Sequence, residues 1–178
     1  MNAPPLQRGI HLLAGPVQGG KTTFAGRLAG MLEARDTPAG GFLCPGWFSE
    51  GVRAGFHLVN IRTGERLILA GTRQRAGWIP FRRFWFHPEA FRAGEQWIRE
   101  AVDSRPSLLV VDEVGPMEME GGGWSGLLDE LTGKREILQL WIVRLPLAEE
   151  VAVRWGISRK RIIRTGRETP ESLSERIT

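Results

Sequence analysis

A glycine-rich segment early in the chain constrains its fold more than any other feature. Residues 15–22 read GPVQGGKT and fit the phosphate-loop pattern G-x-x-x-x-G-K-S/T. In this pattern glycines let consecutive backbone N–H groups turn inward around phosphates, the lysine reaches the β- and γ-phosphate oxygens, and the hydroxyl ligates Mg²⁺. The apolar run 10–14 precedes the segment as a strand would, and apolar residues recur at helical spacing from Thr22 onward. The sequence therefore predicts a strand, a phosphate-binding turn and a helix whose N-terminus faces the phosphates.

This pattern supplies the first candidate site residues. We expect Lys21 to contact the terminal phosphates and Thr22 to ligate Mg²⁺, with a nucleoside triphosphate as the bound substrate. The alternative is a glycine-rich turn that binds no ligand, and the strand and helix on either side argue against it. The residues expected to bind the nucleotide are Gly15, Pro16, Val17, Gln18, Gly19, Gly20, Lys21, Thr22 and Thr23.

Length and composition are those of one globular domain. The chain has 178 residues, of which 42% are hydrophobic and 25% charged, so we expect a single P-loop domain over residues 1–178. Cys44 is the single cysteine, and no basic head followed by a long apolar core suggests a signal segment. Every apolar run is shorter than the ~20 residues that a membrane helix needs. We therefore expect a reduced, cytoplasmic protein that does not bind a membrane through a spanning helix.

The formal net charge of +4 favours anionic ligands but does not choose among nucleotides, nucleic acids and acidic proteins. Basic residues gather between positions 154 and 167, where Ile162 and Ile163 interrupt them as a short strand would. We favour a solvated rim around a final strand over a nucleic-acid surface. No protein partner is indicated, and we expect a monomer.

The apolar pattern alternates between strands and helices, which is typical of an α/β fold with a largely parallel sheet. Arg62-Thr63-Gly64-Glu65 joins two of the runs as a tight turn, so we expect an antiparallel hairpin added to that sheet. The expected strands are 10–14, 41–44, 56–61, 66–70, 107–111 and 137–143, and the expected helices are 22–35, 89–102, 124–132 and 147–155.

A second motif follows a buried strand. Residues 108–113 read LLVVDE, so two carboxylates lie at the carboxyl end of an apolar strand, where a P-loop protein places the acid that serves its metal. We expect Asp112 to hold Mg²⁺ through water. Glu113 would point elsewhere and would orient or deprotonate a water for attack on the γ-phosphate. No N-K-x-D element for guanine recognition occurs in the sequence.

Residues 112–118, DEVGPME, resemble the D-E-I/V-G-x-M-E signature of the THEP1-type nucleoside-triphosphatases, and residues 50–56, EGVRAGF, are similar to that family's E-x-x-R…G-F segment. The resemblance covers about residues 9–145. It implies a P-loop NTPase fold of the RecA-like type, a three-layer sandwich with a mixed, mainly parallel sheet. It also implies Mg²⁺-dependent hydrolysis of nucleoside triphosphates to diphosphates with loose base preference.

By position, the resemblance makes Arg53 a third candidate catalytic residue beside Lys21 and Glu113. Arg53 either neutralises charge on the γ-phosphate or is an ion-paired surface residue. Glu118 either supports the metal shell or forms hydrogen bonds at a helix start or loop. The segment 42–55 is compressed relative to the family and residues 165–170 match its ending only loosely, so we expect a divergent member.

Residues 78–86 are aromatic and carry two arginines. Both alternation classes are apolar, which favours a strand packed in the core or at a sheet edge over contact with a nucleotide base or a partner. The three histidines are too far apart in sequence to suggest a transition-metal site, and Cys44 is expected to be a small buried residue.

Three functions remain open from the sequence. The first is a nucleoside-triphosphatase. The second is a nucleotide-gated binding module that assists cofactor or metalloenzyme assembly, in which hydrolysis is incidental. The third is a small-molecule or nucleic-acid kinase, in which Glu113 serves as the base for an acceptor hydroxyl.

Overall fold

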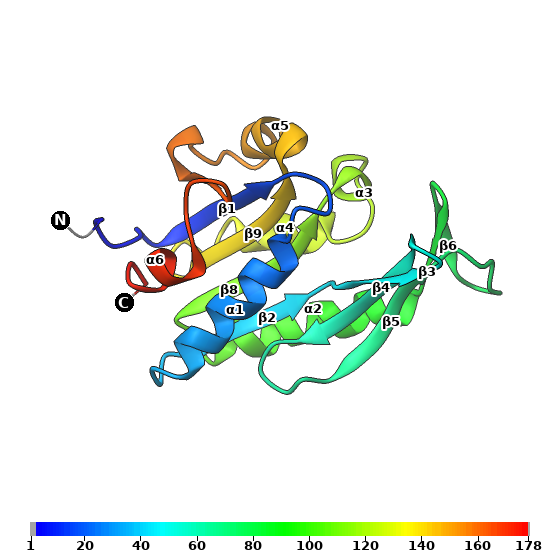
Figure 1. Ribbon diagram of the computed structural model, residues 1–178, viewed down its shortest axis with the longest axis horizontal. Helices are drawn as coiled ribbons and strands as arrows, with labels where there is room; N and C mark the ends of the chain where they lie inside the picture. The colour runs from blue at the N-terminus through cyan, green and yellow to red at the C-terminus, as the bar shows by residue number, and fades with distance from the viewer. Residues whose placement is uncertain (1–2, 178) are drawn as a thin grey trace.

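The chain folds around one ten-stranded sheet that is covered by helices on both faces (Figure 1). The structure is a computed structural model that describes residues 3–177, so the ends of the domain predicted over 1–178 lie outside it. The strands are β1 (Gly9–Gly15), β2 (Ala39–Leu43), β3 (Gly46–Ser49), β4 (Val52–Asn60), β5 (Arg66–Gly71), β6 (Ile79–Phe81), β7 (Phe84–Phe86), β8 (Leu108–Val114), β9 (Leu138–Arg144) and β10 (Ile162–Arg164).

The helices alternate with the strands as the sequence pattern predicts. They are α1 (Lys21–Glu33), α2 (Pro88–Asp103), α3 (Pro116–Met119), α4 (Ser125–Leu131), α5 (Ala148–Arg154) and α6 (Pro170–Ser174), with short 3-10 turns η1 (Leu145–Leu147) and η2 (Arg159–Arg161). None of the helices within residues 3–177 combines the length and apolar character required to span a bilayer.

The sheet runs in the order β10-β1-β9-β8-β2-β4-β5-β7-β6, with β3 paired to β4 off this path. The strands from β10 to β2 are parallel, and β4 to β7 continue the sheet in antiparallel fashion. The strands predicted as the parallel core are therefore its centre, and the mixed α/β sheet is confirmed.

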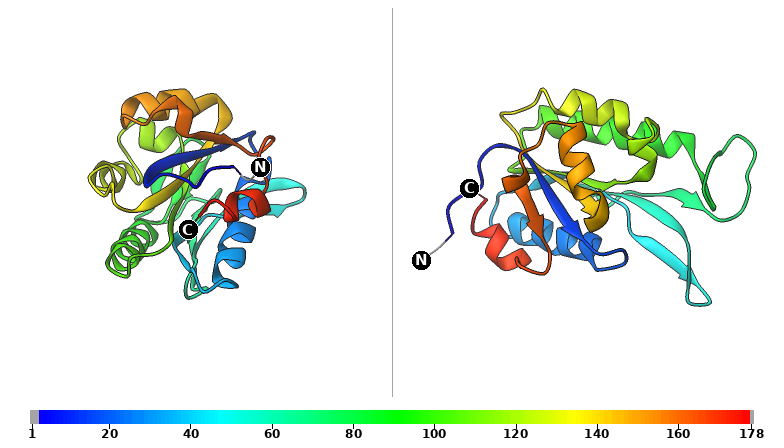
Figure 2. Two further views of the ribbon diagram at one scale, coloured as in Figure 1. Left: turned by 90° about the vertical axis from the view of Figure 1, so that its left-hand side faces the viewer. Right: turned by 90° about the horizontal axis from the view of Figure 1, so that it is seen from above.

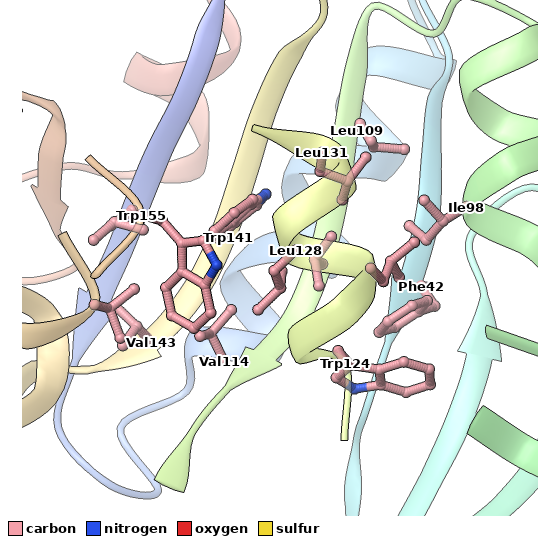
Figure 3. Close-up of a cluster of buried hydrophobic side chains, with 14 of the residues drawn as sticks. Phe42, Ile98, Leu109, Val114, Trp124, Leu128, Leu131, Trp141, Val143 and Trp155 are labelled. Carbon is pink, nitrogen blue, oxygen red and sulfur yellow. The ribbon is translucent and has the colours of Figure 1, made fainter. Parts of the chain in front are cut away.

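Alternating side chains of the central strands enter two separate cores. Leu13 of β1 packs with α1 and α6, whereas its neighbour Leu12 faces the opposite core, formed with α2, α4 and α5. In that second core Trp141 of β9 is fully buried against Trp155, and Leu128 of α4 fills the space beside it (Figure 3). Strands buried on both faces must be apolar throughout, which explains the continuous runs in the sequence.

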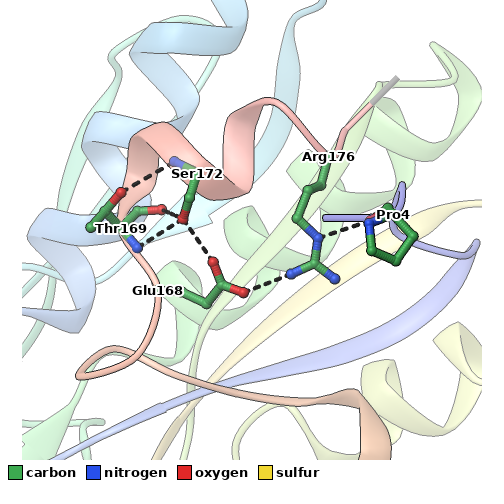
Figure 4. Close-up of polar contacts among 5 residues, drawn as sticks. All are labelled: Pro4, Glu168, Thr169, Ser172 and Arg176. Atoms are coloured by element: carbon green, nitrogen blue, oxygen red, sulfur yellow. Dashed lines mark hydrogen bonds and ion pairs between the residues drawn. The ribbon is translucent and has the colours of Figure 1, made fainter. Parts of the chain in front are cut away.

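The two ends of the described chain are tied together beside α1 (Figures 2 and 4). Glu168 accepts a hydrogen bond from Ser172 at 2.7 Å and pairs with Arg176 at 2.7 Å. Arg176 Nε in turn donates to the carbonyl of Pro4 at 3.0 Å. These contacts fix α6 and the turn before it, which follows β10.

The predicted hairpin is confirmed: β4 and β5 pair antiparallel, and Gly64 in their connection has φ 73°, a value that a side chain disfavours. The segment 78–86 packs at a sheet edge, one of the two placements expected for it, but it is not the single strand that was expected. The segment folds back at Arg82 and Arg83 into a second hairpin, β6–β7, at the edge of the sheet. Phe84 and Phe86 pack on Phe56 and Phe91, whereas Ile79, opposite Phe86 in the hairpin, is 47% exposed.

Candidate functional site

The glycine-rich segment forms a turn between β1 and α1, as predicted. Gln18 and Gly20 have positive φ values of 56° and 77°, which bend the backbone back on itself. A side chain at Gly19 would place its Cβ 2.5 Å from Cγ of Pro16, so glycine is required at this position. The turn therefore presents backbone N–H groups at the N-terminus of α1, where an anion is favoured.

Lys21 folds back over this turn. Its Nζ donates a hydrogen bond of 2.8 Å to the carbonyl of Pro16, and the side chain is 6% exposed. Burial lowers the pKa of Lys21, and the nearby carboxylates of Glu113 and Asp112 act in the opposite direction. The ammonium thus lies between the phosphate-binding turn and the acidic end of β8.

Asp112 and Thr22 are brought together although 90 residues separate them. Asp112 Oδ2 accepts from Thr22 Oγ1 at 2.7 Å and from the backbone N–H of Cys44 at 2.9 Å. The other oxygen, Oδ1, is buried and has no hydrogen-bond partner among the described residues. Burial raises the pKa of Asp112 to about 6, with the neighbouring Glu113 as a second cause.

This arrangement fits a divalent cation. A hydroxyl, a buried carboxylate and an unused carboxylate oxygen are the hard oxygen donors that Mg²⁺ prefers, and Mg²⁺ usually takes only one or two protein ligands beside phosphate and water. No group of three or more His, Cys, Asp or Glu side chains in residues 3–177 is arranged so that it could hold a metal ion.

Glu113 has a different hydrogen-bond partner from Asp112. Its Oε1 accepts a hydrogen bond of 2.9 Å from Arg144 Nε, and both side chains are about one-third exposed, at 27% and 31%. Arg144 ends β9 and lies in register with Gly15, the first residue of the phosphate-binding turn. Arg144 therefore connects the phosphate-binding turn to Glu113.

Arg144 and the backbone of Cys44 were not identified from the sequence. Arg144 was detectable in principle, because it is the first charged residue after the apolar run 137–143. The contact of Cys44 depends on the pairing of β2 with β8 and leaves no mark in the sequence. Cys44 itself is buried, as expected, and burial raises the pKa of its thiol well above the ordinary value.

Arg53 of β4 enters the same region. Its guanidinium lies 5.0 Å from the ring centre of Phe56 and 5.2 Å from that of Phe48, and Nε is buried without a hydrogen-bond partner. Burial lowers the pKa of Arg53, and among the nearby acids Glu113 has the largest effect, which raises the pKa. Among the described residues Arg53 forms no ion pair, so the ion-paired surface alternative does not apply.

Glu118 forms hydrogen bonds that stabilise the loop after β8. Its Oε2 accepts from the N–H of Gly115 at 2.8 Å and its Oε1 from the N–H of Trp124 at 3.1 Å. The side chain is 5% exposed, and burial raises its pKa to about 7. Of the two roles considered for Glu118, the structure supports the hydrogen-bonding one at the start of α3.

These residues surround a cavity of about 410 Å³ that extends from the phosphate-binding turn to the β6–β7 hairpin. Its lining includes Gln18 and Thr22 of the turn, Glu113 and Arg53, and several aromatic side chains. The structure thus places every predicted catalytic and metal-binding residue around one continuous space or directly beside it.

Sequence comparison adds an independent line of information. The family model NTPase_1, described as NTPase, matches residues 11–165. A nucleoside-triphosphatase THEP1 from Methanopyrus kandleri is 32% identical over 105 residues, which cover 59% of this chain and 57% of that protein. A protein of the same name from Caldivirga maquilingensis is 29% identical over 126 residues, which cover 71% and 70% of the two chains. The aligned segment thus spans just over half of the Methanopyrus relative.

Two solved structures share the architecture. The solution structure of a human cancer-related nucleoside triphosphatase superposes with a TM-score of 0.61 at 22% identity, covering 91% of this chain and 87% of that one. The crystal structure of THEP1 from Aquifex aeolicus gives a TM-score of 0.58 at 19% identity, with 88% of each chain covered. At these identities the likeness establishes the P-loop α/β fold.

Proposed function

This chain belongs to the NTPase_1 family of NTPases, and we propose that it is a Mg²⁺-dependent nucleoside-triphosphatase that acts with loose base preference. The observation that carries the proposal is the hydrogen bond between Thr22 and Asp112, with Glu113 beside it at the end of β8. It joins the phosphate-binding turn to the acids needed for metal binding and water activation, as hydrolysis of a bound triphosphate requires.

Thr22 and Asp112 are the residues that would hold Mg²⁺. When bound there, the ion would neutralise charge that develops on the phosphate oxygens. The backbone N–H groups of the turn and Lys21, whose Nζ lies over the turn, would bind the phosphates. Thr23, in the first turn of α1, completes the proposed nucleotide-binding set.

Glu113 is the proposed base. The oxygen of a water forms a bond to the γ-phosphorus, the bond from that phosphorus to the β,γ-bridging oxygen breaks, and the water proton passes to the Glu113 carboxylate. Arg144 holds Oε1 of this carboxylate and so directs the second oxygen toward the water. We assign to Arg53 the stabilisation of charge on the γ-phosphate, because its guanidinium lines the same cavity without an acidic partner.

The test is phosphate release from ATP, GTP, CTP and UTP, with and without Mg²⁺, by the unaltered protein and by Glu113→Gln. We expect metal-dependent release that the variant reduces at least ~100-fold while nucleotide affinity is retained, since the base acts only in the transition state. Glu120→Gln is the matched control, because Glu120 is an exposed acid in the same segment.

Two results would contradict the proposal. Tight nucleotide binding without phosphate release would favour a binding module over an enzyme. Undiminished turnover by Glu113→Gln, with Glu120→Gln also active, would remove Glu113 from the role of base. We further propose that the catalytic unit is a single domain and works as a monomer, which sedimentation of the nucleotide-bound protein would check.

A further inference from the structure

The cavity beside the phosphate-binding turn is larger than a triphosphatase needs for one attacking water. β1, which leads into the turn, has β10 on one side and β9 and β8 on the other. In the proposed function, Lys21 and Thr22 contact the outer phosphates of the bound nucleotide. Glu113, at the end of β8, lies beyond the γ-phosphate. We place the nucleoside part of that nucleotide toward β10, which leaves the part of the cavity toward β7, lined by Phe84 and Phe86, for another ligand.

The far wall of this space is aromatic. Phe86 stacks on Phe91 with ring centres 5.8 Å apart, and Phe91 meets Trp124 edge-on at 4.6 Å. Phe84 of β7 contacts Phe86 at 6.5 Å and Phe56 at 5.2 Å. These five rings, contributed by β4, β7, α2 and the loop before α4, form one continuous apolar face that lines the cavity. A planar ligand would be bound there by stacking and burial.

The same cavity is rich in cations. Arg53, Arg82, Arg83 and Arg144 line it, against only two acids, Glu113 and Glu118. Glu113 is paired with Arg144, and Glu118 is occupied by two backbone N–H groups. Arg83 lies 4.6 Å from the ring centre of Phe84, and neither Arg82 nor Arg83 forms an ion pair among the described residues. The surplus of positive charge is therefore available to an anionic group.

From these features we propose that the cavity is a second binding site, which takes a small aromatic anion of the nucleoside monophosphate type while the phosphate-binding turn holds the triphosphate. The volume of about 410 Å³ lies within the range of small-molecule sites. Rings on the wall receive the planar part of the ligand, and Arg82 and Arg83 of the β6–β7 hairpin receive its anionic group.

A ligand in this site affects the hydrolytic reaction directly. It fills the space through which water reaches Glu113, so phosphate release falls as the site fills. The triphosphate stays bound, because the phosphate-binding turn and Lys21 hold it and the second ligand replaces none of those contacts. Only this kinetic consequence depends on the proposed triphosphatase activity; binding of the second ligand does not.

The experiment is calorimetric titration with four nucleoside 5′-monophosphates, the corresponding nucleosides and inorganic phosphate, on protein saturated with Mg²⁺ and nucleoside diphosphate. Saturating diphosphate prevents the probes from binding at the phosphate-binding turn. We expect at least one monophosphate to bind with 1:1 stoichiometry. Its nucleoside and phosphate alone should bind at least ~10-fold more weakly, because each lacks either the charge or the ring.

Arg83→Gln and Phe84→Leu should each weaken this binding about 10-fold, since one removes a cationic contact and the other a stacking contact with the ligand. Arg83 is exposed, so its loss should leave the fold intact. Arg73→Gln, which removes an exposed arginine outside the cavity, is the matched control and should not change the affinity. In parallel, the monophosphate should lower kcat for phosphate release without changing KM for the triphosphate.

The proposal fails if no monophosphate binds to the diphosphate-saturated protein. It also fails if one binds with the same affinity to Arg83→Gln, Phe84→Leu and Arg73→Gln, because the site would then lie elsewhere. Failure of triphosphate hydrolysis in the absence of any monophosphate would instead contradict the proposed activity and would leave the binding result to stand by itself.

Discussion

Thr22 Oγ1 donates a 2.7 Å hydrogen bond to Asp112 Oδ2, and this bond joins the start of α1 to the end of β8. The two residues are 90 positions apart. In the sheet, β9 lies between β1, which leads to the turn before Thr22, and β8, which carries Asp112. The hydroxyl and the carboxylate are therefore positioned by the parallel sheet before any ligand arrives. Preorganisation of this kind lowers the free energy needed to order the site on binding.

Replacement of this carboxylate tests the proposed metal site. We expect Asp112→Asn to raise the Mg²⁺ concentration required for phosphate release by about 10- to 100-fold. Nucleotide binding without metal should be little changed, because the turn and Lys21 remain. Titration of Mg²⁺ in the hydrolysis assay measures the effect. Asp103→Asn, at an exposed position, should behave as the unaltered protein, and an unchanged Mg²⁺ requirement in Asp112→Asn would exclude Asp112 as a ligand.

The ion pair between Arg144 and Glu113 predicts a positioning role. Arg144→Gln should lower kcat by about 10- to 100-fold and leave KM close to its original value, since the substituted side chain acts through Glu113 and not on the bound nucleotide. The double variant Arg144→Gln with Glu113→Gln should be no slower than Glu113→Gln alone. Arg99→Gln, which removes a largely exposed arginine, is the control. If the two substitutions reduced kcat independently, Arg144 would act by another route.

Gly19 tests the geometry of the phosphate-binding turn. In Gly19→Ala the added Cβ would meet Pro16 at 2.5 Å, so the turn must deform and nucleotide affinity should fall at least ~10-fold. Gly30→Ala is the matched control, because nothing lies within 4 Å of a Cβ at that helical position. It should keep the affinity and raise stability slightly, as alanine favours a helix by about 1 kcal/mol over glycine. Equal affinities of the two variants would contradict this structure of the turn.

The buried carboxyl of Glu118 predicts a pH effect on stability. Its pKa is raised by burial from 4.5 to about 7, so the folded state holds a proton that the unfolded state has lost between these pH values. The contribution of Glu118 to stability therefore decreases as the pH rises from about 4.5 to 7 and stays low above that. Its total change should not exceed about 3 kcal/mol.

Denaturant unfolding of the protein and of Glu118→Gln at several pH values measures this effect. The free energy of unfolding of the protein minus that of the variant should fall across this pH window. Taking the difference removes the contributions of His11 and His57, whose pKa values are lowered by burial and whose effects have the opposite sign. A difference that is independent of pH would show that Glu118 does not carry the proton.

The local motifs were predictable from the sequence because each needs only a short stretch of chain. The phosphate-binding turn requires glycines beside one lysine and one hydroxyl, and the tight turn at Gly64 requires a residue that accepts positive φ. The buried strands were recognisable because a strand covered on both faces is apolar at every position. Asp112 and Glu113 were identifiable because they end such a strand.

The β6–β7 hairpin shows where this reasoning fails. Its aromatic residues predict one strand packed in the core or at a sheet edge, yet the segment is a hairpin at the edge of the sheet and lines the cavity. Side chains that line a binding space and side chains that fill a core have the same composition. Only their position relative to other elements distinguishes them.

The sequence by itself determined the fold class, the phosphate-binding turn and the identity of the acids, because these depend on local pattern and on the period of apolar residues. The tertiary structure decided which groups meet those acids: Thr22 and the Cys44 backbone at Asp112, and Arg144 at Glu113. These contacts depend on the order and register of strands that are distant in the sequence. No local pattern records that register, because it is set by packing of the whole sheet against its two layers of helices.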